Sequence, residues 1–207
     1  MKEMAKEMNR EIRQARSQAT QFRAAENDGR KYIEGYFSVF GDTYELWPGA
    51  TESIDPHAFD GALSDDIRAL INHDTTLVLG RNKAGTLELK VDSRGLWGRI
   101  EINEKDQDAM NLYARVERGD VNQCSFGFDI LEEDTVYRED GSIHWTIKKV
   151  KLYEVSVVTF PAYEDTSVQA RKKDFEQVKK RQIEKWKAER KERLKNGIKA
   201  ISDNKEN

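Results

Sequence analysis

Residues 147–163, IKKVKLYEVSVVTFPAY, are the stretch that decides the fold. The run is long, rich in β-branched residues and apolar, which is typical of a central strand buried on both faces. Counting by twos from Val150 places Leu152, Glu154, Ser156 and Val158 on one face. An unpaired carboxylate among apolar side chains is unfavourable. We therefore expect Glu154 to have a partner, either a lysine or arginine in a structural ion pair or a histidine.

A second strand is indicated by residues 121–130, VNQCSFGFDI, in which apolar and small polar residues alternate. Ser125 lies on the polar face, and the neighbouring Gly127 leaves its hydroxyl uncovered. Serine is also common on the solvent face of edge strands, so this pattern alone favours the structural interpretation. Cys124 is a rival nucleophile, but alternation directs it to the phenylalanine face, which suggests a packed and inert thiol.

The chain has three histidines, and their contexts differ. His57 lies in a loop beside a proline and His144 in a hairpin arm, so we expect both at the surface. His73 ends an apolar segment, where a side chain can project from the edge of the core into a cleft. A lone histidine of this kind is more often structural than catalytic. A serine, a histidine and a buried carboxylate are nevertheless the parts of a charge-assisted hydrolase, although spacing cannot prove that they meet.

Composition and charge exclude several classes of protein. The chain has 207 residues, 35% of them charged, a net charge of −3 and one cysteine. These values argue against nucleic acid as the main partner, an internal disulfide and a cysteine-cluster metal site. No apolar run approaches the length of a membrane span or a signal peptide, so we expect a cytoplasmic protein without membrane contact. Motifs of α/β-hydrolases, metalloproteases and NTPases are absent.

The sequence predicts three parts. Residues 1–30 read as a charged helical N-terminal extension, residues 31–166 as one packed domain, and residues 167–207 as a basic helical tail with a frayed end. Residues 170–199 carry 13 Lys and Arg against 5 Asp and Glu. Such a tail is either simply a solvated helix or a charged guide toward acidic surfaces. Within the domain, residues 32–40, 85–92 and 95–103 are expected strands, residues 47–63 mostly loop, and residues 106–119 a helix between Asp106 and Gly119.

The order of several segments resembles the prohead maturation proteases of tailed bacteriophages. These segments are EGYFSVFGD, ESIDPHAFD, LINHD, VERGDVNQCSFGF and LYEVSVVTFPAYEDT, and the likeness covers about residues 31–170. His57 departs from the family, which more often has glycine there. The resemblance implies an α+β fold, mainly an antiparallel β-barrel like that of herpesvirus assemblin proteases, with surrounding helices and charged helical extensions.

The resemblance also implies an activity and its residues. Family members are serine endopeptidases that act inside the immature capsid, or prohead, in the host cytoplasm. They remove the scaffold protein or a scaffold-like segment of the major capsid protein, often cleave themselves, and can self-associate. Carried over, the nucleophile is Ser125, the general base His73, and the third member Glu154, with Asp74 and His144 as alternatives. We expect no metal or organic cofactor. A non-catalytic scaffold or assembly chaperone that keeps the protease fold is the alternative function.

Overall fold

The computed structural model describes residues 22–138 and 140–160, together with positions 180, 184, 187, 190 and 191. The chain divides into two compact units, residues 1–164 and 165–207. In the second unit, the five described positions are helical and exposed. The rest of the expected tail helix, and the expected helix before residue 22, lie outside the described residues. Among the described residues, no helix is long and apolar enough to cross a membrane.

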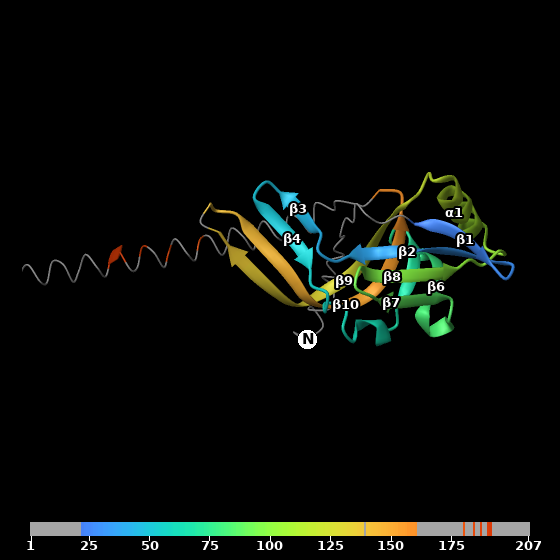
Figure 1. Cartoon of the computed structure of the whole chain (residues 1–207), viewed down its shortest axis with the longest axis horizontal. Coiled ribbons are helices and arrows are strands. Elements are labelled where there is room, and N and C mark those ends of the chain that lie inside the picture. The colour runs from blue at the N-terminus through green and yellow to red at the C-terminus, as the bar shows by residue number, and fades with distance from the viewer. Residues whose placement is uncertain are drawn as a thin grey trace, which may run out of the picture. The chain divides into compact units, whose positions relative to one another are not determined.

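Two sheets make up the first unit (Figure 1). One has the order β1-β2-β8-β7, and the other has the order β3-β4-β10-β5-β6 with β9 paired to β10. The elements are β1 (Arg23–Asn27), β2 (Arg30–Val39), β3 (Thr43–Trp47), β4 (Ala50–Ile54), η1 (Ala62–Ser64), β5 (Arg68–Ile71), β6 (Asp74–Arg81), η2 (Asn82–Ala84), β7 (Leu87–Val91), β8 (Gly95–Glu101), α1 (Gln107–Arg118), β9 (Gln123–Tyr137) and β10 (Ile143–Val158).

Strand β10 organises the larger sheet, as its sequence predicted. Its first part pairs in parallel with β4, its last part pairs in parallel with β5, and β9 runs antiparallel along its other side. Figure 1 shows β3 and β4 beside the outer ends of β9 and β10, with α1 and the smaller sheet toward the opposite end. A residue near the end of β10 therefore has neighbours from β5 on one side and from β9 on the other.

The helix α1 forms where the sequence predicted it. The Asp106 side chain accepts hydrogen bonds from the backbone N–H groups of Asp108 and Ala109, which satisfies two free donors at the helix start. Gly119 ends the helix with φ 88°, a conformation that glycine adopts without strain. The residues that α1 buries are Ala109, Leu112, Tyr113 and Val116.

The core lies against the apolar face of β9. Phe126 is fully buried, its ring stacks on Phe128 at 4.7 Å between centroids, and it meets Phe59 edge-on at 5.6 Å. The thiol of Cys124, on the same face, lies 3.1 Å from the backbone oxygen of Tyr36 in β2. Alternation along β9 therefore turns Ser125 and Gly127 away from the smaller sheet.

Some expectations about the fold are wrong. The sheets are not closed into a barrel: across residues 22–138 and 140–160, no ladder joins the two sheets. Two of the ladders of β10 are parallel, a pairing that no local pattern reveals. In the same two stretches α1 is the single α-helix, beside the short 3-10 turns η1 and η2, so the fold is mostly β-sheet with few helices.

Two segments were also misassigned locally. Residues 23–27 form β1 where a helix was expected, because Asp28 and Gly29, with φ 51° and 73°, make a two-residue turn that pairs β1 with β2. Residues 50–54 form β4 where a loop was expected, and β4 turns back on β3 through Pro48 and Gly49. Strand pairing overrides weak local propensity in both cases.

Replacing Phe126 by alanine tests the assigned core. We expect Phe126→Ala to lower the free energy of unfolding by about 3–5 kcal/mol, because a large ring leaves a cavity in a packed interior. Urea denaturation measures the change. Leu131→Ala is the matched control on the same strand, since that side chain is 58% exposed and its loss should change stability by less than about 0.5 kcal/mol. Equal effects of the two variants would contradict the assigned core.

Candidate active site

His73 lies in the tight turn between β5 and β6. Asn72 and His73 are the two turn residues, with φ 50° and 62°, and the strands pair from Ile71 to Asp74. This left-handed conformation is uncommon outside glycine but enriched for asparagine and histidine. The side-chain oxygen of Asn72 accepts a hydrogen bond of 2.8 Å from the backbone N–H of Thr159, and the backbone N–H of Asn72 donates to the Val157 oxygen at 3.0 Å. The turn is thus fixed to the end of β10.

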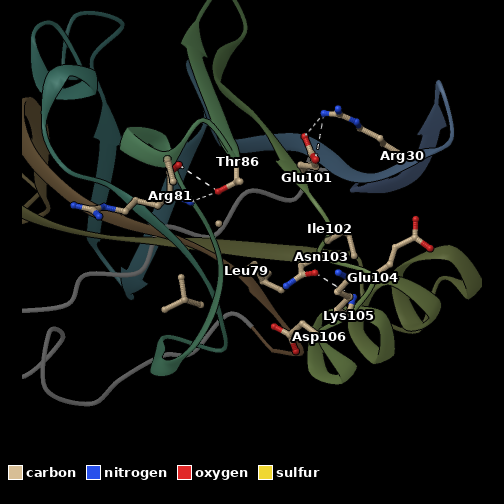
Figure 2. A pocket seen from close by; sticks show the side chains of 13 residues that line it. Arg30, Leu79, Arg81, Thr86, Glu101, Ile102, Asn103, Glu104, Lys105 and Asp106 are labelled. Carbon is tan, nitrogen blue, oxygen red and sulfur yellow. Dashed lines mark hydrogen bonds and ion pairs between the residues drawn. The ribbon is translucent and has the colours of Figure 1, made fainter.

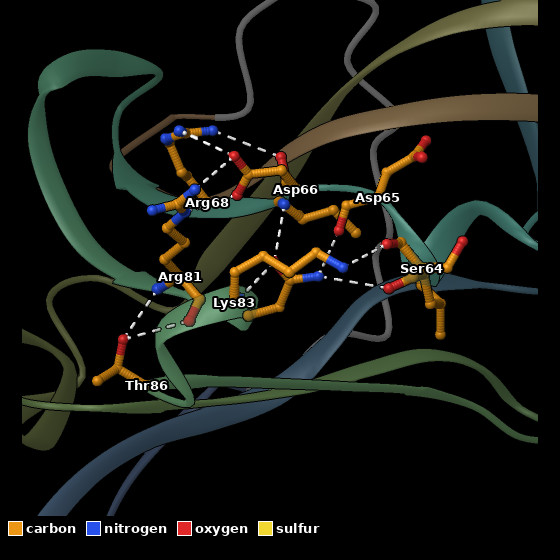
Figure 3. Close-up of polar contacts among 10 residues, drawn as sticks. Ser64, Asp65, Asp66, Arg68, Arg81, Lys83 and Thr86 are labelled. Atoms are coloured by element: carbon orange, nitrogen blue, oxygen red, sulfur yellow. Dashed lines mark hydrogen bonds and ion pairs between the residues drawn. The ribbon is translucent and has the colours of Figure 1, made fainter.

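The other end of the β5–β6 hairpin is held by a surface ion pair (Figure 3). The guanidinium of Arg81 donates two hydrogen bonds to the Asp66 carboxylate, at 2.6 and 2.7 Å, and these hold the pKa of Asp66 below its usual range. Lys83 donates to the backbone oxygen of Ser64 at 2.7 Å. Hydrogen bonds therefore hold the hairpin that carries His73 both at its turn and at its open end.

Glu154 has the histidine as its partner. The Nδ1 atom of His73 lies 2.7 Å from Oε1 of Glu154, and both side chains are 12% exposed. Glu154 does not share a face with Leu152, contrary to the alternation expected from the sequence. The register shifts between them, so Leu152 pairs with Phe128 on the core face and Glu154 pairs with Gly127 on the opposite face.

Gly127 makes room for that carboxylate. A Cβ atom at this position would collide with Oε1 of Glu154 and lie 3.1 Å from its Cγ and Cδ. Real Cβ atoms almost never approach side chains so closely, and the carboxylate is held by His73 from the other side. Glycine is therefore needed at this position because the Glu154 carboxylate takes the space of a Cβ, and not because of the strand's backbone conformation.

Ser125 lies opposite Ser156 across the β9–β10 ladder, on the face that carries Glu154. Both serines are fully buried. The hydroxyl of Ser156 donates to Oε2 of Glu154 at 2.5 Å and accepts from the backbone N–H of His73 at 3.3 Å. Three elements, β5, β9 and β10, thus bring the three sequence-predicted residues into one neighbourhood.

Two buried polar atoms in this neighbourhood are unusual. In the part of the chain that the structure describes, neither the hydroxyl oxygen of Ser125 nor Nε2 of His73 has a hydrogen-bond partner. Buried polar atoms are nearly always paired, and an exception in a native protein calls for an explanation, of which a catalytic role is one. A hydroxyl that can lose a proton and an imidazole nitrogen that can accept one are the components of an activated nucleophile.

The alternative residues lie elsewhere or have other roles. His144 is at the other end of β10, where its ring nitrogens contact the hydroxyls of Thr51 and Ser53 at 2.8 and 2.9 Å, and burial lowers its pKa. The Asp74 carboxylate accepts from the Thr76 hydroxyl at 2.6 Å, which lowers the pKa of Asp74. His57 is exposed and contacts Asp60 in its own loop.

A separate pocket of about 620 Å³ lies between β6 and the segment that joins β8 to α1 (Figure 2). Its lining does not include Ser125, His73 or Glu154. Arg30 on its rim is paired with Glu101 at 3.2 Å, and Arg81 is paired with Asp66. The site follows from the hydrogen bonds around His73, not from the size of this cavity. Within the described stretches, no group of three or more His, Cys, Asp or Glu side chains could hold a metal ion.

Sequence reasoning did not recognise the roles of Ser156 and Gly127. Each had a signal: Ser156 follows Glu154 by two residues in a strand, and Gly127 follows Ser125 by two. Residues two apart in a strand lie on the same face. Ser156 could therefore have been predicted beside Glu154, and Gly127 beside Ser125.

Comparison with known proteins gives two matches. Residues 18–181 match the family model described as caudovirus prohead serine protease. The chain is 32% identical over 164 residues to a protein named prohead protease from Enterobacteria phage HK97, and the match covers 77% of this chain and 68% of the phage protein. No solved structure matches the chain significantly.

The fit between Gly127 and Glu154 can be tested on the folded protein. We expect Gly127→Ala to displace the Glu154 carboxylate from His73, because the added methyl group would collide with Oε1. The ring proton that His73 shares with Glu154 should then lose its low-field resonance in the proton NMR spectrum. Ser125→Ala, two residues away on the same face, adds no bulk and should leave that resonance in place. An unchanged resonance in Gly127→Ala would contradict the assigned contact.

Proposed function

The chain belongs to the caudovirus prohead serine protease family, and on that premise we propose that Ser125, His73 and Glu154 are its catalytic triad. Membership makes the protein a serine protease of phage prohead maturation. The observation that supports these three residues is the hydrogen bond from His73 Nδ1 to Glu154, together with the unpartnered Nε2 and Ser125 hydroxyl on the same side of the sheet.

The mechanism follows from the direction of the proton transfers. A carboxylate can only accept, so the hydrogen bond to Glu154 places the imidazole proton on Nδ1 and leaves the lone pair on Nε2. Nε2 takes the proton of Ser125 while its oxygen attacks the peptide carbonyl. The proton then passes to the departing amine. Water, deprotonated by the same nitrogen, releases the acyl group and restores the Ser125 hydroxyl.

Glu154 contributes orientation and charge. Its carboxylate holds the imidazole in the required tautomer and stabilises the imidazolium that forms when Ser125 attacks. With a side chain only 12% exposed, Glu154 is shielded from water, which strengthens its interaction with that transient charge. Because Ser125 is fully buried, residues that cover it must move before a substrate carbonyl can reach the hydroxyl.

The proposed substrates are those that the family resemblance implies. They are the scaffold protein or the scaffold-like segment of the major capsid protein, and the protease itself. The reaction would take place inside the immature capsid, in the host cytoplasm. The support is the family match over residues 18–181, which includes all three proposed triad residues.

Coexpression with the phage's own capsid and scaffold proteins tests the proposal. We expect Ser125→Ala and His73→Ala to lower the cleavage rate at least about 10,000-fold, and Glu154→Gln to lower it by roughly 10,000-fold through the loss of the correct tautomer. Gel analysis of the capsid and scaffold bands over time measures cleavage.

Two controls match these variants. His57→Ala removes an exposed histidine whose ring contacts Asp60, and Cys124→Ala removes the rival nucleophile beside Ser125. Both should cleave at nearly the wild-type rate. Cleavage that survives Ser125→Ala but stops in Cys124→Ala would overturn the serine assignment. Processing that survives every triad variant would instead favour a non-catalytic assembly role.

A further inference from the structure

We propose that Ser156 is a positioning residue of the triad, which fixes the carboxylate of Glu154 and thereby the tautomer of His73. The inference rests on the proposed function, because a positioning residue has a role only if His73 and Glu154 act on Ser125. The hydroxyl of Ser156 bonds the backbone of His73 and the carboxylate of Glu154, and neither of these groups is a reacting atom of the proposed mechanism.

The direction of each hydrogen bond around Ser156 follows from its donor. The backbone N–H of His73 can only donate, so at 3.3 Å the Ser156 oxygen is the acceptor. The hydroxyl proton is then free to be donated, and Oε2 of Glu154 accepts it at 2.5 Å. That leaves Oε1 to accept the ring proton of His73 Nδ1 at 2.7 Å. The bonds form a closed ring that begins and ends on His73.

This ring fixes both oxygens of the carboxylate. A glutamate side chain held by His73 alone could rotate about its last torsion, which has a broad and roughly two-fold preference. With Oε2 bound by Ser156 and Oε1 bound by His73, the carboxylate has one orientation. The same serine anchors the backbone of His73, so it positions two members of the triad at once.

The ring also distinguishes the two serines that face each other across the β9–β10 ladder. Ser125 and Ser156 are paired in register and equally buried. The hydroxyl of Ser156 is engaged as donor and acceptor, whereas within the described residues the Ser125 hydroxyl has no partner. Only Ser125 therefore has a proton available for Nε2 of His73. A purely structural serine would satisfy a local backbone group and would not join two members of the triad.

Substitutions at Ser156 separate positioning from packing. Ser156→Ala should lower kcat by about 10–100-fold with little change in KM, as expected for a group that orients a reacting residue through another one. Ser156→Thr keeps a hydroxyl on a strand that tolerates β-branched residues, and should recover kcat to within a few-fold of wild type. Ser156→Cys keeps the size but substitutes a weak donor, so it should behave like Ser156→Ala. Kinetics with a peptide from the capsid cleavage site supply both constants.

Two controls exclude a loss of folding. Ser38→Ala removes another fully buried serine, on β2, and should leave kcat unchanged. Thermal unfolding shows whether each variant is folded, and the low-field proton NMR resonance of His73 Nδ1 should weaken in Ser156→Ala and return in Ser156→Thr. A merely structural role would not move that resonance.

The outcomes are distinguishable. If Ser125→Ala is inactive but folded Ser156→Ala keeps the wild-type kcat, or if Ser156→Thr is as impaired as Ser156→Ala, the positioning role is overturned while the triad stands. If Ser125→Ala cleaves like the wild type, the triad itself is wrong and the role of Ser156 is overturned with it.

Discussion

The hydrogen bond between His73 and Glu154 is the interaction on which the rest of the site depends. It gives a buried carboxylate the partner that its burial demands, and it directs the free imidazole nitrogen away from Glu154. Two unusual local features place the partners of this bond. The left-handed turn at Asn72 and His73 brings the ring over the sheet, and Gly127 provides space for the carboxylate. Without the bond, each feature would be an unexplained irregularity.

Strand β10 makes the bond possible because it lies between two neighbours near its end. One neighbour, β5, delivers His73 from the adjoining turn, and the other, β9, delivers Ser125. The register shift before Glu154 turns its side chain from the apolar core to the polar face. A regular strand would have placed Glu154 beside Leu152 in the core. The bulge is therefore part of the site.

Local patterns predicted well what local forces determine. The start and end of α1, the strand character of β9 and β10, and the turn of Ser125 away from the phenylalanine face all follow from caps, periodicity and burial. The demand of Glu154 for a partner also came from the sequence. Pairing between distant segments could not be predicted in this way. The parallel ladders, the open sheets, β1 and β4 depend on contacts between residues that are far apart in the sequence. The face of Glu154 was misjudged because a bulge breaks the count by twos. The proximity of His73 to Glu154 could be expected only from the family resemblance.

Covalent labelling tests the central claim most directly. A fluorophosphonate reacts with a serine only when a base removes its proton, so it reports activation of the hydroxyl and not simply its presence. The protein should be treated under conditions in which it is active as a protease, digested, and mapped by mass spectrometry. The account predicts a single modified residue, Ser125, in the wild type and no modification in folded His73→Gln. A label on Cys124 or Ser156, or equal labelling of Ser125 in His73→Gln, would contradict it.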